Sequence, residues 1–138
     1  MRVILDTNVL LSAFIRVNSK PYKLVQAWLD GVFELVSSAD QIEEISRVSR
    51  YPRVRQLIGP AELGWLVNRI RDRGLIIERL AKVDISSDPA DNFLLAMAQA
   101  GDAAFLVTGD KSGLLAIRQH LKTRIISTTE FMAEIGLR

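Results

Sequence analysis

The sequence of 138 residues contains no cysteine and a single histidine, His120. The lack of cysteine excludes disulfide scaffolds, cysteine nucleophiles and thiolate metal sites, and one histidine excludes metal sites built from several histidines. A bound metal would therefore be held mainly by oxygen atoms, which favours Mg²⁺, Mn²⁺ or Ca²⁺ over Zn²⁺. His120 itself lies late in a helical pattern, and we expect it to be an ordinary surface residue.

Long apolar runs are also missing, since none reaches the roughly 18 residues of a membrane-spanning helix. At the start, three apolar residues (3–5) precede Asp6, which is too short for the apolar region of a signal peptide. We therefore expect a cytoplasmic protein with no membrane partner. Internal repeats, low-complexity segments and linkers are absent as well, so the whole chain, 1–138, is predicted to form a single domain.

Positive charge is concentrated in one part of the chain. The window from Arg47 to Arg73 contains seven arginines (47, 50, 53, 55, 69, 71 and 73) against Glu62 and Asp72. It therefore carries +5, and because the whole chain carries +2, the remainder carries −3. A basic stretch with acidic residues elsewhere suits an anionic polymer as partner, and it suits a solvated helical surface equally well.

Short apolar runs alternate with helical patterns. Strands are predicted at 3–5, 33–36, 104–107 and 124–126, and residues 75–77 fit a strand or a helix tail. Helices are predicted at 9–15, 21–30, 38–49, 60–73, 89–100 and 111–119, several of them with capping residues at their starts. Strands that are apolar on both faces and connected through helices form a parallel sheet covered by helices, which is the α/β class.

Two carboxylates follow strands of this expected sheet. Asp6 comes directly after strand 3–5, and Asp110 follows strand 104–107 within Thr108-Gly109-Asp110. Parallel strands end at the same edge of the sheet, which is where open α/β sheets bind ligands. Asn8 either orients Asp6 or a water, or it caps the next helix. Thr108 either hydrogen-bonds an acidic ligand or caps the next turn.

Two further acids lie on helices that begin at the same edge. At the helical period, Glu44 lies on the border of the apolar face of helix 38–49, whereas Glu43 points away, so Glu44 is the better site candidate. Asp91 lies within the apolar arc of its helix, where an acid is costly unless it is compensated. Alternatively, Asp91 completes the cap of that helix. Asp88 is explained as the N-cap, and a direct role in the site is its second interpretation.

The four acids Asp6, Glu44, Asp91 and Asp110 thus converge on one edge. Carboxylates a few ångströms apart repel each other by about 4 kcal/mol per close pair at an effective dielectric of about 20. No lysine or histidine stands beside them to compensate this charge, apart from Lys111 next to Asp110. Protonation or a divalent cation would relieve the repulsion, and a carboxylate set without His or Cys suits Mg²⁺ or Mn²⁺. Such a site suits the attack of water on a phosphodiester.

Four segments, in this order, resemble the PIN-domain family, and more narrowly the VapC-related toxins of bacterial and archaeal toxin–antitoxin pairs. They are VILDTNVL (3–10), IEEI (42–45), DPADNFLLA (88–96) and FLVTGD (105–110), followed by the closing segment 125–131. The resemblance implies a three-layer α/β/α sandwich with a central parallel sheet. It also implies an endoribonuclease that depends on Mg²⁺ or Mn²⁺.

The resemblance assigns roles to individual residues. The acidic residues of the family map onto Asp6, Glu44, Asp91 and Asp110, and its frequent Asn and Thr map onto Asn8 and Thr108. Asp88 belongs to a pattern that is common in this subgroup. Three partners are implied: an RNA substrate, a second copy of the chain in a homodimer, and a cognate antitoxin whose tail enters the acidic site.

The leading hypothesis is therefore metal-dependent RNA cleavage. Asp6, Asp91 and Asp110 would bind the metal, Glu44 would bind it or position the attacking water, and the arginines of 47–73 would hold the RNA backbone. The same chemistry would also serve DNA. A second hypothesis is a non-catalytic PIN-like module that binds RNA or protein. A third, a phosphatase or phospho-receiver that uses Asp6 as nucleophile, is disfavoured because Asn8 stands where a haloacid-dehalogenase-type phosphatase would need a second aspartate.

Overall fold

A mostly parallel sheet runs through the protein, whose computed structural model describes residues 1–86, 88–109 and 113–137. Within these residues, six strands lie in the order β3-β2-β1-β4-β6-β5. The parallel strands are β1 (Arg2–Leu5), β2 (Glu34–Ser38), β3 (Leu75–Ile77), β4 (Phe105–Thr108) and β6 (Thr123–Ser127). The four predicted strands are confirmed, and residues 75–77 form a strand rather than a helix tail.

The other edge of the sheet departs from the prediction. Helix α7 (Gly113–Ile117) ends at Ile117, before the predicted end at 119, and β5 (Gln119–His120) follows it and pairs antiparallel with β6. Arg118 and Leu121 adopt positive φ angles of 66° and 51°, which turn the chain sharply on either side of β5. The sheet is therefore mixed at this edge, and the expectation that all strands are connected through helices and run parallel was wrong here.

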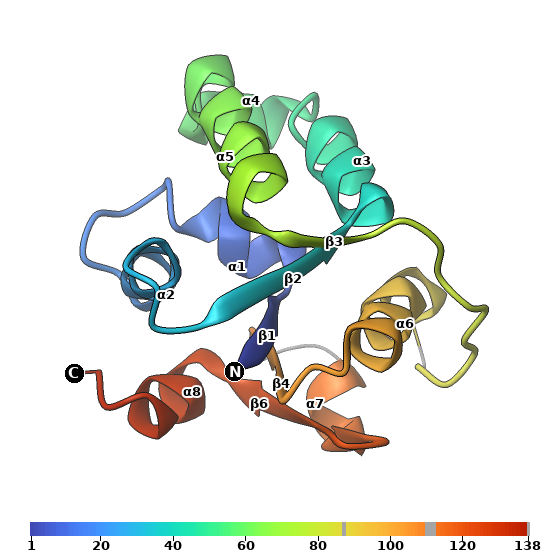
Figure 1. Cartoon of the computed structure of the whole chain (residues 1–138). Helices are drawn as coiled ribbons and strands as arrows, with labels where there is room; N and C mark the ends of the chain where they lie inside the picture. The colour runs from blue at the N-terminus through green and yellow to red at the C-terminus, as the bar shows by residue number, and fades with distance from the viewer. Residues whose placement is uncertain (87, 110–112, 138) are drawn as a thin grey trace.

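Alternate residues of each central strand face opposite layers. In β1, Val3 and Leu5 join one apolar core and Ile4 joins the other, as the period of two for strands requires. Figure 1 shows α6 (Asn92–Gly101) and α7 on one side of the sheet, with α2 (Lys20–Leu29) and α8 (Thr128–Glu134) on the other. The expected three-layer α/β/α architecture is confirmed. In the part of the chain described here, no helix has the length and apolarity needed to span a membrane.

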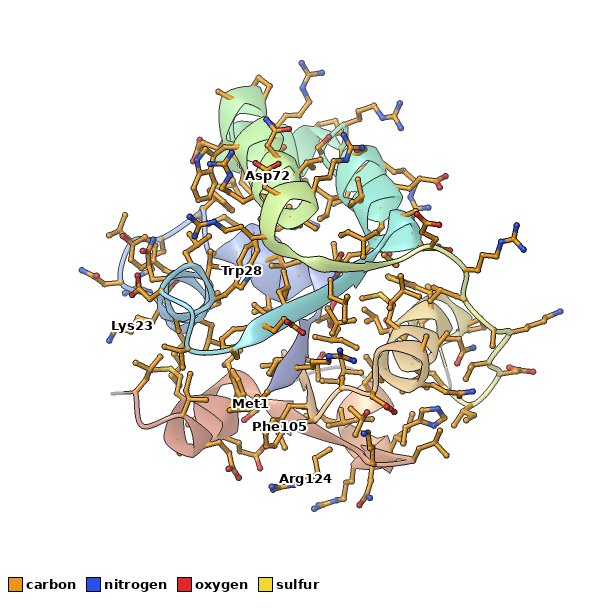
Figure 2. The ribbon with its side chains drawn as sticks, in the orientation of Figure 1. Met1, Lys23, Trp28, Asp72, Phe105 and Arg124 are labelled. Carbon is orange, nitrogen blue, oxygen red and sulfur yellow. The ribbon has the colours of Figure 1, made fainter. Side chains whose placement is uncertain are left out.

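Three helices form a projection that we call the arm: α3 (Ala39–Val48), α4 (Pro52–Leu57) and α5 (Pro60–Arg73). Helix α4 is absent from the predicted helices, which leave residues 50–59 unassigned, and Pro52 occupies the first turn of this additional helix. Trp28 is only 4% exposed and lies between α2 and the arm, whereas Asp72 lies on α5 (Figure 2). The arm leaves the sheet where β2 ends and returns at β3.

Several helix starts follow the predicted capping residues. The Ser127 hydroxyl accepts from the Glu130 N–H, and the Glu130 carboxylate accepts from the Ser127 N–H, each at 3.1 Å. This is the complete capping box that the sequence indicates. At α3, the Ser38 hydroxyl accepts from the Gln41 N–H at 3.1 Å. The second half of that box does not form, because the Gln41 side chain turns into the core.

Helix α6 lies unusually close to the sheet at its C-terminal end. Its last residue, Gly101, is buried, and a Cβ there would lie 2.8 Å from Cγ1 of Val36 on β2. Asp102, with φ of 52°, supplies the left-handed residue that ends the helix. The prediction that Gly101 terminates this helix is thus corrected, because Gly101 serves close packing and Asp102 the termination. At its other end, α6 begins at the edge where β1 and β4 end.

Candidate acidic site

Asp6 lies where β1 ends and α1 (Thr7–Ser12) begins. Its Oδ1 accepts from the Asn8 N–H at 3.3 Å, which makes Asp6 the N-cap of α1. Its Oδ2 accepts from the Thr108 hydroxyl at 2.7 Å, and Thr108 ends the neighbouring strand β4. The carboxylate is therefore held by two adjacent strand ends, as the sequence predicted for this edge.

The supporting residues Asn8 and Thr108 play different parts. Thr108 is fully buried and donates to the carboxylate of Asp6, so its hydroxyl binds an acidic residue of the chain, whereas the sequence interpretation was a hydrogen bond to an acidic ligand. Asn8 contributes its backbone N–H, and its side chain is exposed. The alternative that Asn8 caps α1 is wrong, since Asp6 occupies the capping position.

Asp6 is buried, and no positively charged side chain among the described residues pairs with its carboxylate. Its exposed fraction is 8%. Burial raises the pKa of Asp6 above its ordinary value, and the hydrogen bonds from Thr108 and Asn8 lower it in part. Two neutral donors thus hold a carboxylate that has no counter-ion among the described side chains.

Asp91 ends a 3₁₀ turn, η1 (Pro89–Asp91), directly before α6. Its side chain makes no capping hydrogen bond, so the alternative that it completes the cap of the helix is not supported. Desolvation, together with the negative charges of Asp6, Asp88 and Glu44 in that order, raises the pKa of Asp91 to about 6. The structure therefore brings Asp6, Glu44 and Asp91 into one electrostatic cluster, which we call the acidic edge.

Glu44 lies on the side of α3 that faces this cluster, as predicted, and Glu43 is exposed. The Glu44 side chain is 20% exposed, and its Oε2 lies 3.6 Å from Nη2 of Arg47. Arg47 is one helical turn further along α3 and is mostly exposed. Glu44 is therefore the one member of the acidic edge with a cation nearby, in a loose surface pair that contributes little to stability.

Asp88 is the N-cap of η1, as its simpler interpretation predicts. Its Oδ1 accepts from the Ala90 N–H at 3.0 Å, and its side chain is exposed. Its charge nevertheless contributes to the raised pKa of Asp91. Asp110, the remaining predicted ligand, lies outside the described residues, so its role stays a prediction from the sequence.

Two buried amides that the sequence analysis missed hold the acidic edge in place. Gln41 is fully buried, and its Nε2 donates to the Leu5 carbonyl at 2.9 Å while its Oε1 accepts from the Ser37 hydroxyl at 2.6 Å. This ties α3 to the strand end that carries Asp6. Asn92 accepts through Oδ1 from the N–H groups of Ile85 and Ser86, at 3.1 and 2.8 Å. It thereby fixes the loop that enters η1.

The donor chemistry of the acidic edge fits a hard divalent cation. Uncompensated carboxylates that raise each other's pKa are the groups whose repulsion such a cation would neutralise. Among residues 1–86, 88–109 and 113–137, no three Asp, Glu or His side chains stand close enough to coordinate one ion. Mg²⁺ usually takes one or two carboxylates and keeps its waters or phosphate oxygens as other ligands, which Asp6 and Asp91 could satisfy.

The arginine-rich window does not form one continuous positive surface. Arg69 pairs with Asp72 at 3.0 Å and lies 5.7 Å from the ring centre of Trp65, and Arg73 donates to the Leu29 carbonyl. The remaining arginines include three that line a groove of about 560 Å³ within the arm, which we call the arm groove. It is lined by Ile45, Ile58, Leu63 and Val67 and by Arg50, Arg55 and Arg71.

Comparison with known proteins identifies the family. A sequence profile of the PIN domain matches residues 2–112. The chain belongs to the PIN-domain family. The match spans all four acids that the sequence analysis selected, and the resemblance drawn from the four sequence segments is confirmed. No curated protein matched the sequence.

The PIN fold of this chain is similar to a solved structure described as VapBC2 from Rickettsia felis bound to a DNA fragment from their promoter. The superposition covers 92% of this chain and 98% of the other, with a TM-score of 0.58 and 17% sequence identity. At this identity, the likeness establishes a common fold. The three-layer sandwich expected from the sequence is thus found in the structure and in a relative of known structure.

Proposed function

We propose that this PIN domain is a divalent-cation-dependent endoribonuclease and the toxin of a toxin–antitoxin pair. The observation that carries the proposal is the acidic edge, where desolvation and the charges of Asp6, Asp88 and Glu44 raise the pKa of Asp91 to about 6, and where no described cation pairs with Asp6 or Asp91. Among the described side chains, this is a costly arrangement for a purely structural surface. A charge-neutralising ligand accounts for it.

Each residue of the acidic edge has a proposed part. Asp6 and Asp91 hold the cation, together with Asp110 as the sequence predicts, and Glu44 binds it or accepts a hydrogen bond from the attacking water. When bound, Mg²⁺ or Mn²⁺ supplies positive charge that activates water and stabilises the phosphodiester as it gains negative charge. Thr108 and the Asn8 N–H act through Asp6, because they fix the direction of its carboxylate.

RNA cleavage is tested with purified protein and a structured RNA pool in Mn²⁺, in Mg²⁺ and in EDTA. The variant is Asp6→Asn, and the matched control is Asp72→Asn, an exposed acid on α5. We expect cutting by wild type and control in either metal, and none in EDTA or by Asp6→Asn. Equal cutting by all proteins would indicate a contaminating nuclease, and metal-free binding of RNA without cutting would favour the non-catalytic module.

The arm groove supports the proposal of an antitoxin partner. Its apolar lining beside Arg50, Arg55 and Arg71 suits a protein segment that is apolar on one face and acidic on the other. The similar structure is described as a complex of two components, VapBC2. We propose that the antitoxin of this chain binds here, and that its tail reaches the acidic edge.

This partner is tested by co-expression with the product of a small reading frame upstream of the gene for this chain. We expect a complex that survives purification and that is lost when Arg55→Glu and Arg71→Glu are combined. Arg16→Glu, an exposed arginine before α2, is the matched control and should retain the partner. A complex that is insensitive to the two groove substitutions would contradict this docking surface. The homodimer stays a prediction, and light scattering of the purified chain is the measurement for it.

A further inference from the structure

Two adjoining clefts lie beside the acidic edge, between α3 and the start of α6. The first, of about 280 Å³, is lined by Asp40, Glu43, Glu44, Arg47, Ala90 and Phe93. The second, of about 320 Å³, is lined by Asp40 and Phe93 together with residues 80–83, Asn92 and Ala96. Because Asp40 and Phe93 line both, the clefts are neighbours on either side of these two side chains, and their combined size is that of a small-ligand site. We refer to them together as the joined clefts.

The side chains that line the joined clefts include an aromatic ring, carboxylates and cations. Phe93 is half-buried, packs on the α6 side of the core and leaves part of its ring open to both clefts. Asp40 is exposed on the first turn of α3. Each cleft also has one cation in its lining, Arg47 in the first and Lys82 in the second. The two clefts therefore share an aromatic ring and a carboxylate, and each adds a cation of its own.

We propose that the joined clefts bind one unpaired guanine nucleotide of the substrate RNA, next to the phosphodiester that is cut. The base stacks on Phe93, and its N–H groups donate to the carboxylate of Asp40. The phosphates on either side of this nucleotide contact Arg47 and Lys82. Stacking on an aromatic ring and hydrogen bonds to the base edge are how proteins recognise single-stranded RNA.

The carboxylate of Asp40 selects among the four bases. A carboxylate offers two acceptor oxygens and no donor when it is ionised. Guanine presents two adjacent N–H donors, N1–H and its 2-amino group, which match both oxygens. Adenine and cytosine place an acceptor nitrogen beside their amino group, and uracil places a carbonyl on either side of its N–H, so each would set an acceptor against the carboxylate.

The clefts open onto the acidic edge itself. Glu44 lines the first cleft, and its charge contributes to the raised pKa of Asp91. Ala90, which also lines it, directly precedes Asp91. A base held on Phe93 therefore places its own phosphate beside the carboxylates. The inference rests on the proposed function in taking RNA as the ligand and in placing the cut phosphodiester at the acidic edge.

The test measures RNA binding in EDTA, so that it does not depend on cleavage. The probe is a fluorescent single-stranded RNA with one guanosine among adenosines and uridines, compared with the same RNA carrying inosine, which lacks the 2-amino group. Fluorescence anisotropy should give about tenfold weaker binding of the inosine strand by wild type, the loss of one hydrogen bond to a charged acceptor. Asp40→Asn should bind both strands alike.

Two further variants separate stacking from general effects. Phe93→Leu keeps an apolar side chain against α6 but removes the ring, and it should weaken both strands by about tenfold, as the loss of one stacked base does. Asp72→Asn, an exposed acid on the arm, should discriminate as wild type does. Melting temperatures of the variants, compared with wild type, show whether each is folded.

Equal binding of the two strands by wild type, preserved discrimination in Asp40→Asn, or no binding of RNA would each overturn the inference. Cleavage in Mn²⁺ by the same wild-type sample separates this result from the proposed activity. Cutting without guanine discrimination would overturn the guanine site and leave the endoribonuclease standing. Discrimination in EDTA without cutting in Mn²⁺ would support the guanine site and contradict the endoribonuclease.

Discussion

The acidic edge and the arm differ in how their charged side chains are arranged: like charges lie together at the first and are spread over the surface of the second. At the acidic edge, Asp6 and Asp91 lie near one another, and neither belongs to an ion pair among the described residues. On the arm, apolar side chains such as Leu66 are buried and arginines remain at the surface, as in an ordinary amphipathic helix. The charge distribution of the arm therefore costs the fold little, whereas the acidic edge keeps like charges together at a cost.

The means by which the two regions are held also differ. The acidic edge depends on hydrogen bonds between distant segments, such as those from Thr108 to Asp6 and from Gln41 to the Leu5 carbonyl. The arm depends on contacts between neighbouring helices and on pairs within one turn, such as Arg69 with Asp72. Substitutions should thus change activity, and also stability, at the acidic edge, and should change stability or partner binding in the arm.

The largest effect is expected from Asp6→Asn on cleavage. Loss of a cation ligand removes several kcal/mol of stabilisation from the transition state, so the rate should fall on the order of a thousandfold. Calorimetric binding of Mn²⁺ should weaken in parallel. Because burial raises the pKa of Asp6, the charged form is disfavoured in the fold, and the melting temperature should not fall. A clear fall would show that Asp6 has a structural role.

The next largest effect is expected from Gln41→Ala on stability. The substitution leaves the Leu5 carbonyl and the Ser37 hydroxyl without their buried partner, which should cost about 2–3 kcal/mol in the free energy of unfolding. Urea unfolding measures this loss. Gln26→Ala, an exposed glutamine on α2, is the matched control and should change stability by less than about 0.5 kcal/mol. Equal losses would contradict the part assigned to Gln41.

Asp91→Asn should stabilise the protein, and only at higher pH. The folded pKa of about 6 lies above the ordinary value of 3.8, so the contribution of Asp91 to stability is full below 3.8 and is lost as the pH rises through 6. In EDTA, the variant should therefore exceed wild type by at most about 1 kcal/mol at pH 7.5, after discounting for solvent screening. At pH 3.5 the two should coincide. Urea unfolding at both pH values measures the difference.

Adding Mg²⁺ gives a second test of whether the charge on Asp91 destabilises the fold. The cation should stabilise wild type at pH 7.5 and should stabilise Asp91→Asn less, because it binds the folded carboxylates. A variant that is less stable than wild type in EDTA at pH 7.5 would show that Asp91 stabilises the fold in its charged form. That outcome would remove the main difference between the acidic edge and the arm.

The smallest effect is expected from Gly64→Ala in the arm. Gly64 is exposed inside α5, and a Cβ there would meet no atom within 4 Å. Alanine should therefore raise the free energy of unfolding by about 0.5–1 kcal/mol through helix propensity alone. Urea unfolding measures the gain, and RNA cleavage should be unchanged. A loss of stability would indicate that the backbone at Gly64 is not an ordinary helix.

The sheet and the position of Asp6 could be predicted because they depend on short-range patterns. Residues 3–5 are apolar on both faces and end at a carboxylate, and residues 104–107 end at Thr108. Parallel strands place such ends together whatever else the chain does. The choice of Glu44 over Glu43 likewise needed only the helical period, and the exposures of the two side chains agree with it.

Other features could not be predicted because they depend on contacts between distant segments. Gln41 fits a capping box, but the partners of its side chain come from β1 and β2. His120 was expected at the surface, but it is 8% exposed and lies 3.2 Å from Oε1 of Gln99 on α6. The hairpin that buries His120 depends on positive φ angles at Arg118 and Leu121, for which neither residue type gives a signal.

Helix α6 packs against β2 most closely at Gly101, so a change in packing at this point would tilt the whole helix. Ten residues of helix place its first turn about 15 Å from this point, and a tilt of about 5° would carry that end roughly 1 Å sideways. Asp91 stands at the moving end, whereas Asp6 is anchored in the sheet. A methyl group added at Gly101, between the helix and Val36, would therefore displace the N-terminal end of α6 the most. Displacements of about 1 Å near a reacting group can lower the rate about a hundredfold.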